Sequence, residues 1–280
     1  MKIFNWNLNE KLNTNDDLIM CLGGFESLHL GHNELFKLAK SYKNDNPNSK
    51  LAISIFANSI KNNEVIEKKL LQLKVRLYIL ANLNFDYVFI ITPNKEIINI
   101  SDNKFIEELK KMNIKTIICG QDYRFGFNHQ GDISKLKKHF NVHVASEKKV
   151  NHSKISTHLI KELISEGNIN YANELLLEKY ALIIKADKFI FHLPENIIKI
   201  KSGIYVVNAI IKDIEYHGLC LISKYSNDNK LYLFDITTIP SKHQEIYTEF
   251  LGAIRYIDTK QNDNINDEDL KIAKKYLESI

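Results

Sequence analysis

The sequence contains little cysteine and no long apolar run. Its three cysteines, Cys21, Cys119 and Cys220, are odd in number and far apart, which favours buried free thiols over disulfide or metal-binding roles. No apolar run approaches the roughly 20 residues of a membrane-spanning helix, and residues 1–11 lack the apolar core of a signal peptide. We therefore expect a cytoplasmic protein that has no membrane partner.

The chain also lacks a block of basic residues. Lysine and arginine number 38 against 34 acidic residues, and the two signs are interspersed, which gives a net charge of +4. This balance suits an enzyme of anionic substrates and an ordinary solvated surface equally, and we expect no nucleic-acid partner. With 280 residues, 44% of them hydrophobic, the chain is long enough for two packed domains. The sequence makes no prediction of the oligomeric state.

A short apolar run near the N-terminus leads into a turn that contains glycine and histidine. The run Leu18–Leu22 has no polar alternation and predicts a buried strand. The turn after it contains Gly23, Gly24, His29, Gly31 and His32. The segment from His32 or Asn33 to Tyr42 predicts a helix, whose positive N-terminus would face the same turn.

This turn has the composition of a phosphate-binding loop. Glycines let backbone N–H groups approach an anion without a Cβ in the way, and imidazoles can donate hydrogen bonds to charge that develops on a phosphate. A tight turn followed by surface histidines is the alternative interpretation. The complete string Gly24-Phe25-x-x-x-His29-x-Gly31-His32, between a strand and a helix, favours nucleotide binding.

Strand and helix patterns alternate through the first part of the chain. Apolar runs predict strands at Lys50–Phe56, Tyr87–Ile91 and Thr116–Cys119. Leucines at helical spacing predict a helix of about four turns over Leu70–Leu80, and a second helix is predicted over Lys104–Met112. The alternation indicates a parallel sheet with helices on both faces and with ligands at the carboxyl ends of the strands.

Two later segments place polar groups where a ligand would bind. Cys119–Asp132 follows a predicted strand and offers acidic, basic and aromatic side chains, although a charged loop with packed aromatics would look the same. In Ile155–Glu174, Ser156 or Thr157 precedes apolar residues at helical spacing. A hydroxyl at that position caps the helix and can also hold a phosphate.

The N-terminal string resembles the GxFDGxHxGH signature of the bacterial bifunctional riboflavin kinase/FAD synthetase family, within the HxGH nucleotidylyltransferase superfamily. Glu26 stands where the family usually has Asp, and Ser27 where it has Gly. The second segment, Cys119–Asp132, is similar to the family's VGEDFRFG…GD, with Gln121 for Glu and Tyr123 for Phe.

The third segment resembles the family's ISSTxIRELL…EGDVEEANELL. Lys161 replaces the Arg of that motif and His158 replaces its Thr, whereas Ala172–Leu176 agrees without gaps. The family's TFEPHP segment, which usually follows the second strand, survives only as Phe56.

The resemblance implies a Rossmann-like α/β domain over residues 1–185. This domain would join an adenylyl group from ATP to FMN and give FAD and pyrophosphate, with Mg²⁺ accompanying ATP. The implied catalytic residues are His29 and His32. The implied nucleotide-binding residues are Gly23, Gly24, Phe25, Gly31, Gly120, Ser156, Thr157 and Lys161. The implied FMN-binding residues are Asp122, Tyr123, Arg124 and Phe125.

From about Asp187, short β-like runs separated by turn residues replace the alternation. The predicted strands are Lys188–His192, Ile197–Ile200, Gly203–Lys212, Tyr216–Ser223, Leu231–Ile236 and Glu245–Tyr256. We expect a small antiparallel β-barrel over residues 186–280, closed by a helix over Asp267–Ser279.

The expected barrel resembles the riboflavin kinase module of the same family in its position and in the strings Gly203-Ile204-Tyr205 and Leu233-Phe234-Asp235. Phosphoryl transfer needs a phosphate-binding loop, a metal held by oxygen ligands and a base near the acceptor hydroxyl. The module's GRxxGFPTAN loop is missing here, and Lys230 stands where its EVHLLDF strand has the acid. Because an ammonium group cannot accept a proton at neutral pH, we expect no kinase activity.

Three alternatives remain open at this point. The chain could adenylylate another phosphate acceptor, such as nicotinamide mononucleotide or phosphopantetheine, although the second and third segments belong to the flavin family. It could be a bifunctional enzyme with a divergent, working kinase. It could also be a flavin- or nucleotide-binding protein without turnover, which the replaced residues Glu26, Ser27, Gln121 and His158 favour.

Overall fold

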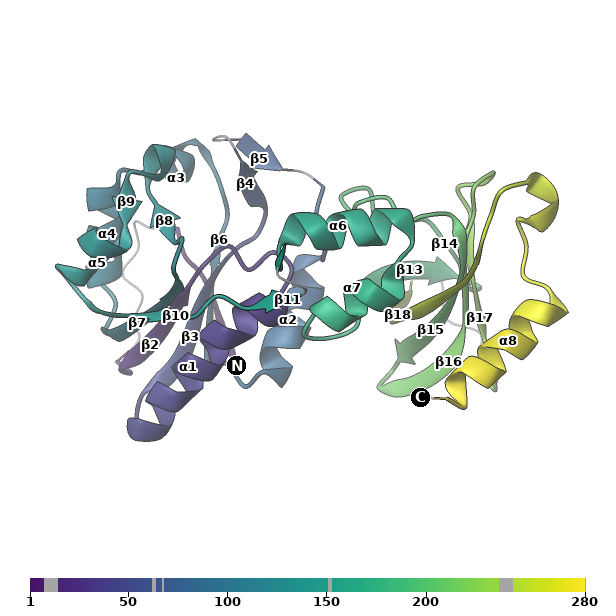
Figure 1. Ribbon diagram of the computed structural model, residues 1–280, viewed down its shortest axis with the longest axis horizontal. Helices are drawn as coiled ribbons and strands as arrows, with labels where there is room; N and C mark the ends of the chain where they lie inside the picture. The colour runs from purple at the N-terminus through teal and green to yellow at the C-terminus, as the bar shows by residue number, and fades with distance from the viewer. Residues whose placement is uncertain (8–14, 62–63, 67, 151–152, 237–243, 280) are drawn as a thin grey trace. The chain divides into compact units, whose positions relative to one another are not determined.

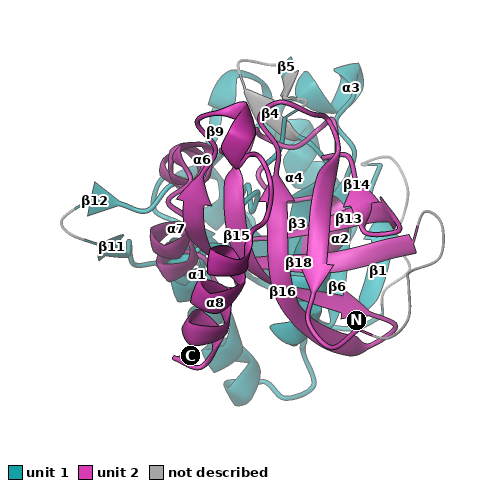
Figure 2. Ribbon diagram, turned by 90° about the vertical axis from the view of Figure 1, so that its right-hand side faces the viewer, with its two compact units in different colours: residues 1–69, 76–156 teal, residues 70–75, 157–280 magenta. Residues whose placement is uncertain are grey.

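The computed structural model describes residues 1–7, 15–61, 64–66, 68–150, 153–236 and 244–279. The chain forms two compact units, the first made of residues 1–69 and 76–156 and the second of residues 70–75 and 157–280 (Figure 2). The chain therefore changes unit after Ser156, earlier than the boundary expected at 185/186. Hydrogen bonds explain where the change falls, because the side chain of Asn173 bonds to the main chain of Tyr180, Phe250 and Leu251.

The first unit is built on a parallel six-stranded sheet (Figure 1). Its order is β1 (Lys2–Asn5), β6 (Tyr87–Ile91), β3 (Lys50–Phe56), β2 (Leu18–Leu22), β7 (Ile114–Gly120) and β10 (Asn141–Ala145). Among the described residues its helices are α1 (Leu30–Asp45), α2 (Leu73–Asn82), α3 (Lys95–Ile98), α4 (Asp102–Lys110) and α5 (Ile133–Lys137), and the first three residues of α2 belong to the second unit. The predicted parallel sheet is confirmed, and β2, β3 and β6 have the predicted bounds.

The two faces of this sheet are covered by different helices. Successive side chains of a strand point to opposite faces. Leu18, Met20 and Leu22 share one buried cluster with Phe105 and other side chains of α4. Helix α1 contacts β2, β3, β7 and β10 and contributes none of its buried side chains to that cluster, so it covers the opposite face (Figure 1).

The strand order reverses at the pair formed by β2 and β7. From β2 the chain adds β3 and β6 on one side, and it then returns to place β7 and β10 on the other. The two strands run parallel, with Leu22 opposite Cys119, so the loops that follow them begin side by side. Such a topological switch point is where open α/β sheets bind their ligands.

The helix predicted over Leu70–Leu80 is shorter than expected. Helix α2 begins only at Leu73 and has 10 residues. The side-chain amide of Gln72 explains the late start. It donates to the carbonyl of Ile183 and accepts from the N–H of Ile183, which is the pair of hydrogen bonds that a neighbouring strand would make. In the part of the first unit that the structure describes, there are also three two-stranded hairpins: β4 (Ser59–Lys61) with β5 (Glu64–Ile66), β8 (Arg124–Phe125) with β9 (Gly131–Asp132), and β11 (Lys149–Val150) with β12 (Ser153–Lys154).

The second unit is a closed antiparallel barrel preceded by α6 (Thr157–Glu166) and α7 (Ile169–Leu175). Its strands, in spatial order, are β13 (Ala181–Asp187), β14 (Ile190–Phe191), β17 (Asn229–Leu233), β16 (Ile214–Ile222), β15 (Gly203–Ile211) and β18 (Gln244–Tyr256). The predicted small antiparallel barrel is therefore confirmed, and the closing helix is α8 (Asp267–Leu277).

Two strand predictions in the barrel were wrong, and one strand was missed. Ile197–Ile200 forms no strand, although its isoleucines are buried, because only Ile197 pairs with a neighbour, through a single isolated bridge. The predicted strand Lys188–His192 is reduced to Ile190–Phe191, since Lys188 and Phe189 adopt positive φ values of 50° and 69° in the turn after β13. Strand β13, Ala181–Asp187, was not predicted.

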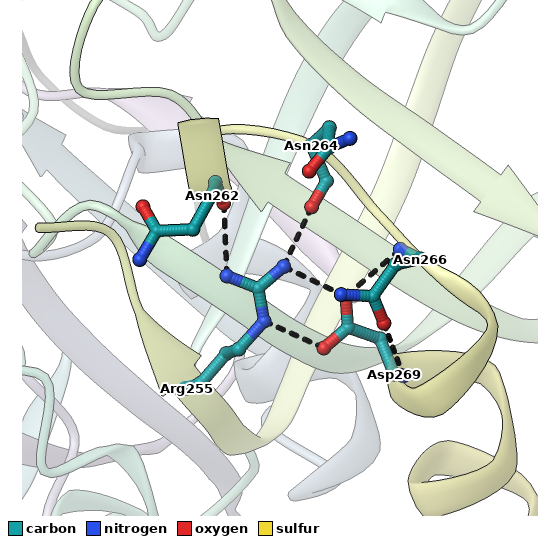
Figure 3. A network of polar contacts seen from close by, with 5 residues as sticks. All are labelled: Arg255, Asn262, Asn264, Asn266 and Asp269. Carbon is teal, nitrogen blue, oxygen red and sulfur yellow. Dashed lines mark hydrogen bonds and ion pairs between the residues drawn. The ribbon is translucent and has the colours of Figure 1, made fainter. Parts of the chain in front are cut away.

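Arg255 of β18 fastens α8 to the barrel (Figure 3). Its guanidinium donates to both carboxylate oxygens of Asp269, at 2.7 and 2.9 Å, and to the carbonyls of Asn262 and Asn264. Asp269 in turn forms a capping box with Asn266 at the start of α8. In the described part of the chain, no helix is long and apolar enough to cross a membrane.

Candidate active site

The glycine-and-histidine turn joins β2 to α1, and its two histidines hold each other in place. His29 is the N-cap residue of α1 and His32 is the third helical residue. Nδ1 of His29 accepts the main-chain N–H of His32, and Nδ1 of His32 accepts that of His29, each at 3.3 Å. The imidazoles stack with their centroids 3.8 Å apart and their planes 13° from parallel.

This reciprocal capping fixes the chemical state of both rings. Because Nδ1 is an acceptor in each ring, the proton of the neutral imidazole is on Nε2. Burial lowers the pKa of His29 to about 4, and burial together with the charges of His29 and Lys154 lowers the pKa of His32 well below its ordinary value. At neutral pH the pair therefore presents two uncharged N–H donors.

Gly31 and Gly24 of the turn differ in the space that a side chain would find. A Cβ on Gly31 would lie 2.9 Å from Cε1 of the His29 ring, so any side chain there would displace that ring. Gly24 is exposed, and a Cβ there would meet nothing within 4 Å. The open space above Gly24 leaves its backbone accessible to a ligand.

The turn is strained, and its aromatic residue is buried beneath it. Phe25 and Leu28 have positive φ values of 44° and 42°, which non-glycine residues rarely adopt and which cluster at functional sites. The Phe25 ring is 1% exposed and packs on His32, with centroids 5.0 Å apart, and on Phe36. Phe25 therefore supports the histidine pair from below.

Arg76 of α2 ties this turn to the end of the neighbouring strand. It is 2% exposed, and its guanidinium donates to the carbonyl of Phe25 at 3.4 Å and to that of Ala57, which follows β3, at 3.1 Å. Burial lowers its pKa to about 10, against the opposing influence of the Glu26 carboxylate. A buried charge thus lies under the carboxyl ends of β2 and β3.

The loop after β7 contains the four residues predicted to bind FMN. Asp122 and Arg124 are exposed; Asp122 pairs with Lys154, and Arg124 lies 3.8 Å from Asp132. Tyr123 is half-buried and stacks on Phe125, whose ring is buried in the cluster under the sheet. Asp122 and Arg124 therefore face solvent near the switch point, whereas Phe125 packs inward.

The remaining predicted nucleotide-binding residues divide between the two units. Gly120 ends β7, beside the start of the histidine turn, and Ser156 is the last residue of the first unit. Thr157 begins α6 and Lys161 lies one turn further on, both in the second unit. The structure thus brings Gly23, Gly24, Phe25, His29, Gly31, His32 and Gly120 together at the switch point of the first unit.

A parallel sheet with a glycine-and-histidine turn at its switch point defines a nucleotide-binding α/β domain. A family model described as FAD synthetase matches residues 11–159, and the chain belongs to that family. A similar full-length protein is the bifunctional riboflavin kinase/FMN adenylyltransferase of Buchnera aphidicola subsp. Acyrthosiphon pisum, 27% identical over 94% of each chain. That of Listeria monocytogenes is 23% identical over 84% of this chain and 82% of its own.

A solved structure shows the same fold. The crystal structure of a macrolide-efflux protein from Streptococcus pneumoniae superposes with a TM-score of 0.77, at 20% identity, over 90% of this chain and 100% of that chain. The two-part architecture, a parallel α/β sheet followed by a closed barrel, is therefore common to both chains.

Sequence reasoning missed two charged residues at this site, Arg76 and Lys154. Arg76 lies inside a leucine-rich helical pattern, where a single Arg between apolar residues was the available signal. Lys154 directly precedes the Ile155-Ser156 pair of the third motif, and the backbone carbonyl of Ile155 is 3.9 Å from the Cβ position of Gly31. Neither residue's proximity to the turn could be read from spacing.

Proposed function

We propose that this protein is an FMN adenylyltransferase, which transfers AMP from ATP to FMN to give FAD and pyrophosphate. The observation that carries the proposal is the pair of neutral, stacked imidazoles at the switch point of the sheet. Membership of the FAD synthetase family and similarity to full-length relatives named as FMN adenylyltransferases support the choice of FMN over another phosphate acceptor.

In the proposed reaction, an oxygen of the FMN phosphate attacks the α-phosphorus of ATP. The bond between that phosphorus and the oxygen bridging to the β-phosphate breaks, and pyrophosphate leaves with the electron pair. His29 and His32 donate through Nε2 to phosphate oxygens whose negative charge grows in the transition state. No covalent intermediate is needed, because positioning and charge stabilisation supply most of the rate in such reactions.

Mg²⁺ fits this site as a companion of the nucleotide. Mg²⁺ is commonly held by one or two carboxylates together with substrate phosphates and waters. Among the described residues, no group of three or more His, Cys, Asp and Glu side chains could form a protein cage for a metal. When bound, Mg²⁺ would reduce the repulsion between the two anionic reactants. The exposed carboxylate of Asp122, which pairs with Lys154, is the group near the switch point that would help to hold it.

We further propose that the barrel does not phosphorylate riboflavin. Lys230 lies on β17 and is exposed, and its ammonium group cannot act as a base at neutral pH. Similarity along the whole length to relatives named as bifunctional favours the rival, a working kinase. The barrel of the proposed enzyme has a structural, regulatory or flavin-binding role.

One assay tests both proposals. Purified protein with Mg²⁺ and ATP is given FMN or riboflavin in separate reactions, and the flavins and pyrophosphate are quantified by chromatography. We expect FAD and equimolar pyrophosphate from FMN, and neither FMN nor FAD from riboflavin. FMN formed from riboflavin would establish the bifunctional alternative, and ATP binding without pyrophosphate release would establish a binding protein.

The histidine assignment has its own test. Replacing His32→Ala removes one donor and should lower the rate of FAD formation on the order of 10²–10³-fold, as loss of an oxyanion donor does. The matched control is His139→Ala, because His139 is an exposed histidine of the same unit and should keep the parental rate. An unchanged rate in the His32 variant would remove this residue from the mechanism.

A further inference from the structure

The histidine pair supplies hydrogen-bond donors but no positive charge at neutral pH. Burial holds both imidazoles in the neutral form, with the pKa of His29 lowered to about 4. A triphosphate carries several negative charges, and phosphate sites usually meet such charge with Lys or Arg. The first unit should therefore bring a cation to the same turn.

Lys154, the last residue of β12, lies at the carboxyl ends of both switch-point strands. Its ammonium pairs with the carboxylate of Asp122, and Oδ1 of Asp122 is 3.3 Å from the Cβ position of Gly120 at the end of β7. On the other side, the carbonyl of Ile155, the next residue, is 3.9 Å from the Cβ position of Gly31 in the histidine turn.

The electrostatics agree with this placement. The charge of Lys154 contributes to the lowered pKa of both His29 and His32, so its ammonium lies within electrostatic range of both rings. A second carboxylate, that of Glu147, is 3.5 Å from the same ammonium. The side chain of Lys154 is half exposed, which leaves it accessible to a ligand.

We propose that Lys154 binds a phosphate group of the nucleotide, and that Asp122 and Glu147 hold its ammonium beside the histidine turn until the nucleotide arrives. The inference rests on the proposed function, which identifies that nucleotide as ATP. An exposed ion pair with a carboxylate contributes little, so exchanging Asp122 for a phosphate of higher charge costs little. The charge of Lys154 adds to the effect of burial, which keeps the imidazoles in the neutral form that caps α1 and donates through Nε2.

The hairpin provides a matched control for this lysine. Lys149 of β11 stands directly opposite Lys154, is also exposed, and is 3.5 Å from the same Glu147. Its charge, unlike that of Lys154, is not among the main causes of the lowered pKa of either histidine. Lys149→Met and Lys154→Met thus remove the same charge from the same hairpin.

The test is calorimetric titration of ATP, and separately of pyrophosphate, into the full-length parent and the two variants. Lys154→Met should weaken the binding of both ligands by about tenfold, as the loss of one charge-assisted hydrogen bond does. Lys149→Met should change it less than about twofold. Equal affinities in the Lys154 variant and the parent, or no binding of either ligand by the parent, would overturn the proposal.

A second measurement separates binding from a general structural effect. In NMR titrations the His29 pKa should rise in Lys154→Met and stay at the parental value in Lys149→Met, with unchanged melting temperatures in both. An unmoved His29 pKa would contradict the placement of the ammonium. If the parent bound ATP but made no FAD from FMN, the proposed function would fail, whereas the comparison of ATP affinities would still decide the role of Lys154.

Discussion

The ring of His29 occupies the space that a side chain on Gly31 would need, since a Cβ there would lie 2.9 Å from Cε1 of the ring. We therefore expect Gly31→Ala to push the imidazole out of its stack with His32. The rate of FAD formation should fall about 10²-fold, as it does when a catalytic group moves by about an ångström, and the fold should lose roughly 1–3 kcal/mol from overpacking. Steady-state kinetics and urea unfolding measure the two effects.

Gly24→Ala is the matched comparison, because a Cβ on Gly24 meets nothing within 4 Å. This variant should unfold within about 0.5 kcal/mol of the parent. If the nucleotide backbone passes over Gly24, the added methyl group should raise KM for ATP while stability stays unchanged. A Gly31 variant with full activity would show that the position of the His29 ring does not limit the reaction.

The buried His29 should make the protein acid-sensitive. Its pKa is about 4 in the folded protein and 6.5 when unperturbed, so the unfolded chain binds more protons between these values and stability falls as the pH is lowered. From pH 7 to pH 5 this single group should remove about 2 kcal/mol, and His32 acts in the same direction. Urea unfolding at the two pH values measures the loss.

His29→Asn should reduce this pH dependence, because the amide of asparagine can cap α1 but does not titrate. His139→Asn, at an exposed histidine, should leave it unchanged. The same slope in the His29→Asn variant and the parent would contradict a neutral His29 in the folded state.

Arg76 should stabilise the turn through the two carbonyls that it binds. Arg76→Met leaves the carbonyls of Phe25 and Ala57 without their donor, and we expect a loss of roughly 2 kcal/mol in the free energy of unfolding. Arg76→Lys keeps the positive charge and N–H donors but lacks the planar fork of the guanidinium, so its loss should be smaller than that of Arg76→Met. Lys74→Met on the same helix removes an exposed ion pair with Glu245 and should cost less than about 0.5 kcal/mol. Equal stability of the Arg76 and Lys74 methionine variants would show that the turn does not depend on the guanidinium.

The part of this architecture that could be predicted is the part set by local sequence. Strands β2, β3 and β6 are short apolar runs between clear turns, and they have the predicted bounds. The reciprocal caps of His29 and His32 are also local but were not predicted, since the helix was expected to begin at His32 or Asn33 and α1 begins at Leu30. Arg76, in contrast, reaches a carbonyl 51 residues away, and only tertiary packing brings them together. Ile197–Ile200 failed for a related reason, since burial alone does not say whether an apolar run pairs with a neighbouring strand.

Arg255 and Asp269 should carry much of the attachment of α8 to the barrel (Figure 3). The Asp269 side chain is 2% exposed and accepts two hydrogen bonds from the guanidinium, so removing Arg255 leaves a buried charge unpaired. We expect Arg255→Met to lower the free energy of unfolding by about 3 kcal/mol. Lys271→Met, at an exposed lysine of the same helix, should change it by less than about 0.5 kcal/mol. In a double-mutant cycle, Asp269→Asn should add little to the loss already caused by Arg255→Met, because the two residues act through one network. Additive losses would mean that the two residues hold the helix independently, and hydrogen exchange across α8 would then locate the contacts that fasten it.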